Sequence, residues 1–413
     1  MSRSRTVVAL FGMCALTFAL FIPAAAARTR AARGVNGNTI KVAGVGIAYN
    51  FEPDGSIGAQ ARFKRANDTN ELKGLKIEYD GFSDDKGSPD TALTEIRRLV
   101  TQDQVFALVP DLSYVNPTAY LTQQHVPYFG WAIDSSYCSP KPTTKLYGFG
   151  FNGCLLPPNP KRTPDAGNTL YPYVVKKTGN KHPTLAIQAG DSDSGRTAAQ
   201  TQGSAFKGDG FDVVTAKATY PVGSAVADNT PYVQALLTSA NGKAPDTIVC
   251  LLTVECIGLY NQIKASGYTG TFMSSLYNPL LTKALNGAVA RISQVPLESD
   301  TPGIAQLKKD VEAFKPGTTA TSSTAAAYFA ADFFVQALKK AGKNPTPEKV
   351  QQIASTMTWK MAGAAGPTKY PASTVFSVPS CSSIVVSDGT NWNVGEPYAC
   401  STKTFPANLV SLG

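Results

Sequence analysis

Histidine is almost absent from this sequence, whose 413 residues contain only His125 and His182. A serine nucleophile usually needs a histidine base, and zinc sites are built mainly from histidine and cysteine. The sequence also has no C-x-x-C pair, G-x-S-x-G elbow or P-loop. We therefore predict no metal site and no cofactor, and we do not expect an enzyme.

Charged residues are scarce as well, at 16% of the chain against roughly 25% in a typical globular protein. The formal net charge is nevertheless +9, and such an excess can indicate nucleic acid or an anionic membrane as a partner. No dense run of lysine and arginine supports that idea, since the nearest candidate is the trio Arg28, Arg30 and Arg33. We interpret the chain as a mildly basic exported protein that binds no nucleic acid.

The N-terminus has the three parts of a secretory signal peptide. Two arginines stand within the first five residues, 7–22 is an uncharged and largely apolar stretch, and Ala24–Ala27 offers a cleavage site. The apolar stretch is slightly short for a membrane anchor, which needs about 20 residues. We predict that residues 1–27 are a signal peptide, cleaved near Ala26 or Ala27, and that the mature protein is periplasmic or extracellular.

Seven cysteines are present, and Cys14 falls within the predicted signal peptide. Six remain, and an even number in an exported chain argues for disulfides. Six cysteines allow fifteen pairings. We favour pairing of neighbours, because each pair then brackets a loop or hairpin: Cys138–Cys154, Cys250–Cys256 and Cys381–Cys400. A zinc site is the alternative.

Short apolar runs alternate with segments of helical periodicity, beginning at residue 39. Strands are expected at 39–46, 75–79, 105–109 and 127–130, with a loop at 47–56 and helices at 58–67, 89–101 and 117–124. The same order restarts with strands at 184–188, 212–215, 247–252 and 271–273 and helices at 195–206, 232–241 and 258–266. This rhythm is typical of open parallel α/β sheets, here in two tandem lobes.

The last third of the chain has a different pattern. Helices are expected at 302–314, 322–341 and 347–357, followed by strands at 375–378 and 383–386. The aromatic residues of 322–341 recur at helical spacing, which predicts a buried core helix.

Several stretches carry a family likeness through their order and spacing, although none is a strict signature alone. They are Ile40–Ala43 with its following glycines, Gly58-Ala59, Leu75–Asp80 with Asp84-Asp85, Pro127–Trp131, Gly190–Gly195, and Leu259–Gly267 leading to Phe272-Met273. Over roughly residues 38 to 396 the chain resembles the type I periplasmic binding proteins, in particular their leucine/isoleucine/valine-binding branch.

The resemblance implies two doubly wound, Rossmann-like α/β lobes joined by three crossovers. The first lobe would comprise 36–150 plus 297–362, and the second 151–296 plus 363–405. A small organic ligand would occupy the cleft between them, outside the carboxyl ends of the strands, and a hinge motion would close it. The partners it implies are permease subunits of an ABC importer, and a monomer is expected.

The strand-end loops are the expected lining of that cleft. From the first lobe they contribute Phe51, Ser113, Tyr114, Trp131, Asp134 and Ser135, and from the second Asp193, Ser194, Thr253, Leu276 and Tyr277. In relatives that bind amino acids, the loops similar to Ser113-Tyr114 and to 133–135 hold the ligand carboxylate with hydroxyls and backbone N–H groups.

The chain departs from those relatives at Ser274–Tyr277, where they place a carboxylate for the ligand's ammonium. A buried ammonium without a charge partner costs several kcal/mol. Either Asp134 or Asp193 takes this role, or the ligand has no amine. We favour the second alternative, because the aromatic residues of the expected lining suit an aromatic or apolar carboxylate, or an amide; a branched-chain amino acid remains open.

Three functions follow from this pattern. A transport receptor is the leading prediction, and a sensory or regulatory ligand-binding protein of the same fold is the alternative. A secreted serine hydrolase is the third, suggested by Gly-Asp-Ser-Asp-Ser-Gly at 190–195. Neither histidine has an obvious reason to meet Ser192 or Ser194, so we give it least weight.

Overall fold

The computed structural model describes residues 32–138, 145–155, 161–221, 226–370 and 380–413, and Ala32–Gly413 forms one compact unit. The predicted signal peptide and the predicted strand at 375–378 lie outside the described residues. Among the described helices, none combines the length and apolar character needed to span a membrane.

The first sheet is parallel except for its short first strand. Its order is β1-β2-β4-β5-β6, and β3 pairs with β2. Its strands are β1 (Val35–Asn36), β2 (Thr39–Gly46), β3 (Lys76–Asp84), β4 (Ala107–Leu112), β5 (Tyr128–Gly130) and β6 (Gly148–Gly150). The four strands predicted in this part of the chain are confirmed, with limits shifted by a few residues.

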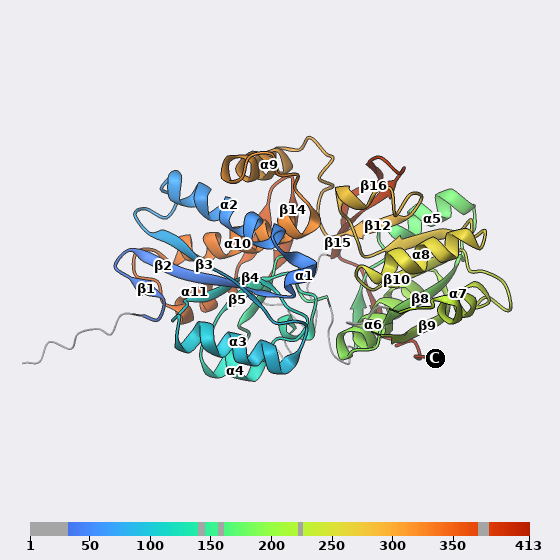
Figure 1. Cartoon of the computed structure of the whole chain (residues 1–413), viewed down its shortest axis with the longest axis horizontal. Coiled ribbons are helices and arrows are strands. Elements are labelled where there is room, and N and C mark those ends of the chain that lie inside the picture. Colours follow the sequence, from blue (N-terminus) through green and yellow to red (C-terminus); the bar gives the residue numbers. More distant parts are fainter. Residues whose placement is uncertain (1–31, 139–144, 156–160, 222–225, 371–379) are drawn as a thin grey trace, which may run out of the picture. The chain divides into compact units, whose positions relative to one another are not determined.

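Helices cover both faces of this sheet because successive side chains of a strand point to opposite faces. Val42, Val109 and Phe129 belong to the core shared with α2 (Asp54–Asp68) and α10 (Ser322–Ala341). Their neighbours Ala43, Leu108 and Tyr128 belong to the core with α3 (Pro89–Thr101) and α4 (Thr118–Gln123), and Figure 1 shows these two helices beside the sheet.

The second sheet has the order β16-β15-β12-β11-β10-β8-β9. Five neighbouring strands are parallel: β8 (Thr184–Gly190), β9 (Asp212–Tyr220), β10 (Thr247–Leu251), β11 (Thr271–Ser274) and β12 (Val289–Ile292). The antiparallel pair β15 (Ser380–Ser387) and β16 (Trp392–Ser401) extends the sheet at β12. Its helices are α5 (Leu170–Thr178), α6 (Asp193–Asp209), α7 (Thr230–Leu237) and α8 (Glu255–Ala265).

The chain passes from the first sheet to the second after β6, returns after β12 and passes again before β15. The helices that follow the second passage are α9 (Pro302–Phe314), α10 and α11 (Pro347–Ala354). Because α10 packs on the first sheet while β15 and β16 complete the second, two mixed α/β lobes are built from interleaved parts of the chain. The exact lobe limits stay a prediction.

Smaller elements complete the fold. They are α1 (Ala48–Phe51), the 3-10 turns η1 (Ser135–Tyr137) and η2 (Pro279–Leu281), and two small antiparallel sheets of two strands each, β13 (Thr358–Met361) with β14 (Ala365–Lys369) and β7 (Arg162–Pro164) with β17 (Thr404–Pro406).

The passages between the sheets are tied to one another by side-chain hydrogen bonds. The Thr368 hydroxyl donates to the Phe151 carbonyl, and the Tyr370 hydroxyl donates to the Gly150 carbonyl at 3.0 Å. The Gly366 N–H donates to the Tyr398 hydroxyl of β16 at 3.0 Å. The end of the first sheet, the third passage and the second sheet are therefore connected within a few residues.

The predicted loop at 47–56 is wrong, because α1 and the first turn of α2 occupy it. Pro53 directly precedes α2 and Asp54 stands in its first turn, both favourable at a helix start. The helix α5 was not predicted, because Pro172 interrupts its pattern. Pro172 lies in the first turn, where the missing N–H has no intrahelical partner to lose.

The six cysteines outside the signal segment form the neighbour pairs that the sequence analysis favoured. The Cα–Cα distances are 4.9 Å for Cys138–Cys154, 6.0 Å for Cys250–Cys256 and 4.0 Å for Cys381–Cys400. The last pair joins directly opposed residues of β15 and β16.

Candidate functional site

Three aromatic side chains meet at the carboxyl edge of the first sheet. The Phe51 ring centroid lies 6.0 Å from that of Tyr114 and 6.3 Å from that of Trp131, in tilted and edge-on arrangements. Phe51 is 5% exposed, whereas Tyr114 and Trp131 are half-buried. We call these three residues the aromatic cluster.

The backbone explains why the cluster forms. Its members follow β2, β4 and β5, which are neighbours in the sheet, and the loops after neighbouring parallel strands share one edge. The N–H of Ala48 donates to Asp84 Oδ1 at 3.0 Å and fixes α1, which carries Phe51. The N–H of Trp131 donates to the Asp111 carbonyl at 3.1 Å. The sequence prediction that these residues lie together agrees with this placement.

Ser113 and Asp134, which were predicted as ligand contacts, have internal hydrogen-bond partners, and their contact with a ligand stays a prediction. Ser113 is fully buried, its hydroxyl donates to Asp85 Oδ2, and its N–H is bound to Asp111. Asp134 is buried and accepts hydrogen bonds from the N–H groups of Ser136 and Asn116. Both side chains therefore hold the loops in place, and their polar atoms are already engaged.

The same edge carries several buried carboxyl groups. Burial raises the pKa of Asp111 well above its usual value, and the nearby Asp134 raises it further. Burial likewise raises the pKa of Asp85 and of Asp134. Within the described residues none of these three carboxyls forms an ion pair. Among the described residues, these three carboxyls therefore have no basic side chain as an ion-pair partner.

The predicted residues of the second lobe have mixed surroundings. Ser194 Oγ donates to the Tyr114 carbonyl at 3.3 Å, which brings the start of α6 to the aromatic cluster. Asp193 is fully exposed and forms an ion pair with Arg196 at 2.7 Å. Leu276 is partly buried. Ser135, which was predicted from the first lobe, is exposed in η1. These contacts do not place the Asp193 carboxylate beside the aromatic cluster, where it could pair with a ligand ammonium.

Tyr277, another predicted ligand contact, is also engaged within the protein. It is 1% exposed, and its ring packs edge-on against Trp392 at 5.6 Å. Its hydroxyl donates to Glu298 and accepts from the Leu297 N–H at 2.8 Å. With its ring and hydroxyl both engaged, Tyr277 anchors the second passage between the sheets.

Sequence reasoning missed one carboxylate, Glu255, in the first turn of α8. Its Oε2 accepts hydrogen bonds from the N–H and the hydroxyl of Thr253, at 3.1 and 2.7 Å. The pKa values of Tyr49, Tyr114 and Tyr220 are raised mainly by burial. The negative charge of Glu255 raises all three pKa values further. Glu255 thus lies near tyrosines of both lobes. Its place two residues after the strand-end Thr253 was the available signal.

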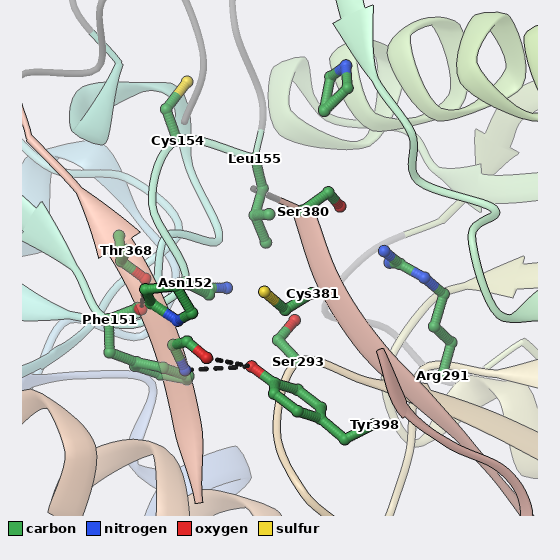
Figure 2. Close-up of a pocket in the computed structure, with 13 residues that line it drawn as sticks. Phe151, Asn152, Cys154, Leu155, Arg291, Ser293, Thr368, Ser380, Cys381 and Tyr398 are labelled. Carbon is green, nitrogen blue, oxygen red and sulfur yellow. Dashed lines mark hydrogen bonds between the residues drawn. The ribbon is translucent and has the colours of Figure 1, made fainter. Parts of the chain in front are cut away.

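A pocket lies elsewhere, where the chain passes between the sheets (Figure 2), and none of the eleven predicted residues lines it. Its lining comes from all three passages: Phe151, Asn152, Cys154, Leu155, Pro164, Arg291, Ser293, Gly366, Pro367, Thr368, Ser380, Cys381 and Tyr398. We call it the crossover pocket. Its residues lie far apart in the sequence, so no local pattern predicted it.

The described residues contain no group of three or more histidine, cysteine, aspartate or glutamate side chains arranged to hold a metal ion.

The fold is shared with known binding proteins. A fatty acid ABC transporter substrate-binding protein from Thermomonospora curvata is 17% identical with a TM-score of 0.71, over 90% of this chain and 95% of that one. An ABC transporter solute-binding protein from R. palustris in complex with 4-hydroxybenzoate is 19% identical with a TM-score of 0.64, over 89% and 97%. A branched-chain amino acid ABC transporter protein from Thermus thermophilus with bound valine is 18% identical with a TM-score of 0.66, over 88% and 96%.

A search of curated proteins found no match to this sequence. Residues 37–376, however, match the family described as periplasmic binding protein, which is most of the chain. The order of two mixed α/β sheets agrees with that match. The chain therefore belongs to the periplasmic binding protein family.

Proposed function

We propose that this chain is the substrate-binding protein of an ABC importer, exported from the cytoplasm and acting as a monomer that delivers a small organic ligand to permease subunits. The observation that carries this proposal is the aromatic cluster, which lies at the carboxyl edge of a sheet in a binding-protein fold. Open α/β sheets bind their ligands at that edge. A sensory protein of the same fold would use the same site but a different partner.

The ligand we propose has an apolar or aromatic body. Phe51, Tyr114 and Trp131 offer ring faces and edges, and the partly buried Leu276 adds an aliphatic surface. Aromatic contacts of this kind contribute about 0.5–1.5 kcal/mol each beyond the area they bury. The similar proteins named above were described with a fatty acid, 4-hydroxybenzoate and valine, and each of these molecules has such a body.

Glu255 changes the argument about an amine. The preference for an amine-free ligand rested on the lack of a carboxylate at 274–277, but Glu255 lies near Tyr49 and Tyr114. Within the described residues no cation forms an ion pair with Glu255. A ligand ammonium there would gain a charge partner and tyrosine rings, two interactions that favour a cation. We therefore propose an ammonium-bearing ligand as the stronger class.

The first test is ligand binding, measured as thermal stabilisation of the mature chain by amino acids, aromatic acids and fatty acids. A ligand that binds only the folded state raises the melting temperature by mass action. We expect stabilisation by ligands with an apolar or aromatic body, and about tenfold weaker binding in Phe51→Leu, which loses the ring contacts.

Phe106→Leu is the matched control for that variant. Phe106 is equally buried, but it precedes β4 and packs on Phe334 at 6.2 Å, away from the carboxyl edge. It should lose stability and keep its affinity. A panel without any stabilising ligand, or equal affinity loss in both variants, would contradict the proposed function.

The second test compares pairs of ligands that differ only in the ammonium group, such as phenylalanine with 3-phenylpropanoate and leucine with 4-methylpentanoate. We expect the amino acid of each pair to bind more tightly, by about tenfold for one charge-assisted contact. Glu255→Gln should remove that difference without weakening the amine-free acid. Tighter binding of the amine-free acid in the unaltered protein would show that the sequence-based preference was right.

A further inference from the structure

Arg291 has surroundings unusual for an arginine. It lies near the end of β12, and its Nε is buried without a hydrogen-bond partner. Within the part of the chain that the structure describes, its guanidinium forms no ion pair. Burial lowers the pKa of Arg291 to about 10, so the group still carries its charge at neutral pH. Buried charges in proteins are normally paired, and an exception calls for an explanation.

Other donors without partners line the same space. Asn152 Nδ2 is buried with no hydrogen-bond partner, while its Oδ1 accepts from the Ala132 N–H at 3.0 Å. The Ser293 and Ser380 side chains are also part of the lining. Figure 2 shows the Arg291 guanidinium directed from its strand toward Ser380. The crossover pocket thus gathers two buried donor atoms, Arg291 Nε and Asn152 Nδ2, that have no hydrogen-bond partner among the described residues.

Two carboxyl groups stand near Arg291, and they do not cancel this surplus of donors. Asp209 and Asp165 face each other, and the field of both reaches Arg291. Burial, followed by the hydrogen bond and charge of Asp165, raises the pKa of Asp209 to about 9. Asp209 is therefore protonated at neutral pH and adds no negative charge beside Arg291.

We propose that the crossover pocket is a carboxylate-binding site, in which Arg291 supplies the charge and Asn152 and Ser293 supply further donors. A guanidinium matches a carboxylate with two parallel N–H groups, which no other side chain offers. The pocket is narrow, so it takes a carboxylate group rather than a large organic body. At the carboxyl edge of the first sheet, by contrast, the buried carboxyls of Asp85, Asp111 and Asp134 form no ion pair among the described residues.

The carboxylate that binds in the crossover pocket has two candidate sources. It can be a small free acid such as acetate, or it can be the acid end of the ligand that the aromatic cluster holds. Because residues from all three passages between the sheets line the pocket, an anion bound there touches the segments that a hinge motion bends. The free-acid case does not depend on the proposed transport function.

The test is the stabilisation of the mature chain by acetate, with acetamide as the neutral analogue and constant ionic strength maintained with sodium chloride. We expect acetate, and not acetamide, to raise the melting temperature. In Arg291→Gln the acetate dissociation constant should rise about tenfold or more, the loss of one charge-assisted hydrogen bond. Arg97→Gln removes the same charge from the exposed face of α3 and should bind acetate normally.

A stability measurement keeps the test valid if acetate binding is weak. Without any added carboxylate, Arg291→Gln should be at least as stable as the unaltered protein, because it removes a partly buried charge that forms no ion pair among the described residues. Equal acetate stabilisation in both proteins, or none in the unaltered protein, overturns the proposal. So does a marked loss of stability in Arg291→Gln alone, since that would mean the guanidinium already has its partners.

Competition separates the two sources. The crossover pocket holds the acid end of the organic ligand if acetate weakens binding of that ligand and Arg291→Gln weakens the binding of acetate and of the ligand alike. If both bind together, the site takes a separate anion. Failure of every organic ligand with retained acetate binding would contradict the transport proposal and leave the anion site standing.

The neighbouring carboxyl pair gives an independent check through pH. As the pH rises through about 9, Asp209 loses its proton and places a negative charge near Arg291. Acetate affinity should then fall. Asp209→Asn should keep its acetate affinity across this range, and an unchanged fall in that variant would contradict the assigned pocket.

Discussion

Replacing Asp332 with alanine is expected to lower the free energy of unfolding by about 3–5 kcal/mol, the usual cost of removing one partner of a buried ion pair. Asp332 is 3% exposed in α10, and its Oδ1 lies 2.7 Å from Arg62 Nε. It also accepts from Trp359 Nε1 at 3.0 Å and from Gln336 Nε2 at 2.7 Å. Alanine would leave the buried Arg62 with Glu71 alone as its charge partner, and it would leave Trp359 Nε1 and Gln336 Nε2 without their acceptor.

The electrostatics of Arg62 support this magnitude. Burial alone lowers the pKa of Arg62, yet the charges of Asp332 and Glu71 raise it overall. Arg65 reaches the same carboxylate at 3.6 Å, so two guanidinium groups lose a counter-charge when it is removed. Urea denaturation of the purified variant gives the free energy directly.

Asp68→Ala is the matched control, because Asp68 also pairs with a basic residue of α2 but is exposed. Its partner Lys64 lies at 2.5 Å on the helix surface. Exposed pairs contribute about 0–1 kcal/mol, so this variant should remain close to the unaltered protein. If Asp332→Ala lost no more than Asp68→Ala, the ion pair between α2 and α10 would not be holding the first lobe together.

The sequence was sufficient for elements whose ends carry their own signals. Helix α10 has the predicted limits because Thr321 and Thr324 form a capping box at its start and Gly342 follows its end. Helices α3 and α9 likewise begin at Pro89 and Pro302, where proline is favoured. The long apolar strand β2 was predicted with its limits, since buried parallel strands are nearly continuous hydrophobic runs.

Elements whose formation depends on distant partners were not predictable from local patterns. The strand β6 has three residues, Gly-Phe-Gly, which is too short for a period to show. It forms because it pairs with β5 along its whole length. The strand β12 was missed for the same reason, as its neighbours β11 and β15 come from separate parts of the chain.

In the candidate site, too, the positions of residues were predictable from local patterns, whereas their hydrogen-bond partners were not. The positions of Phe51, Tyr114 and Trp131 followed from strand ends, which a sequence reveals. The hydrogen bonding of the polar side chains did not follow from strand ends, because it depends on residues far away in the sequence. Ser113 donates to Asp85, and Tyr277 donates to Glu298. A hydroxyl at a strand end is free for a ligand only when the fold gives it nothing else to bind.

The structure also separates two chemistries that the sequence analysis had assigned to one cleft. The carboxyl edge of the first sheet has aromatic rings with a carboxylate, Glu255, nearby, which suits an apolar body and a cation. The unpaired cation, Arg291, lies in the crossover pocket. A ligand carrying both an ammonium and a carboxylate could satisfy both places only if it spans them, and the competition experiment above measures whether it does.

Replacing Gly58 with alanine is the second change with a large expected effect. We expect it to lower the stability of the protein, although helix propensity alone would predict an increase. Gly58 lies inside α2, where alanine would ordinarily be about 1 kcal/mol more favourable. A Cβ at this position would lie 2.0 Å from the Thr324 carbonyl oxygen of α10. Because that oxygen belongs to the backbone, the two helices must separate. We expect a loss of about 3 kcal/mol in the free energy of unfolding, at the upper end of overpacking costs.

Gly258→Ala separates the two contributions, because Gly258 is also inside a helix, α8, but is exposed. A Cβ there would meet only the end of the Asn229 side chain, at 3.3 Å. This variant should gain about 0.5–1 kcal/mol, so the two alanine substitutions should change stability in opposite directions. A gain in both would mean that α2 and α10 do not pack as closely as the structure has them. The buried ion pair between Arg62 and Asp332 spans the same helix interface, so its strength would then have to be smaller as well.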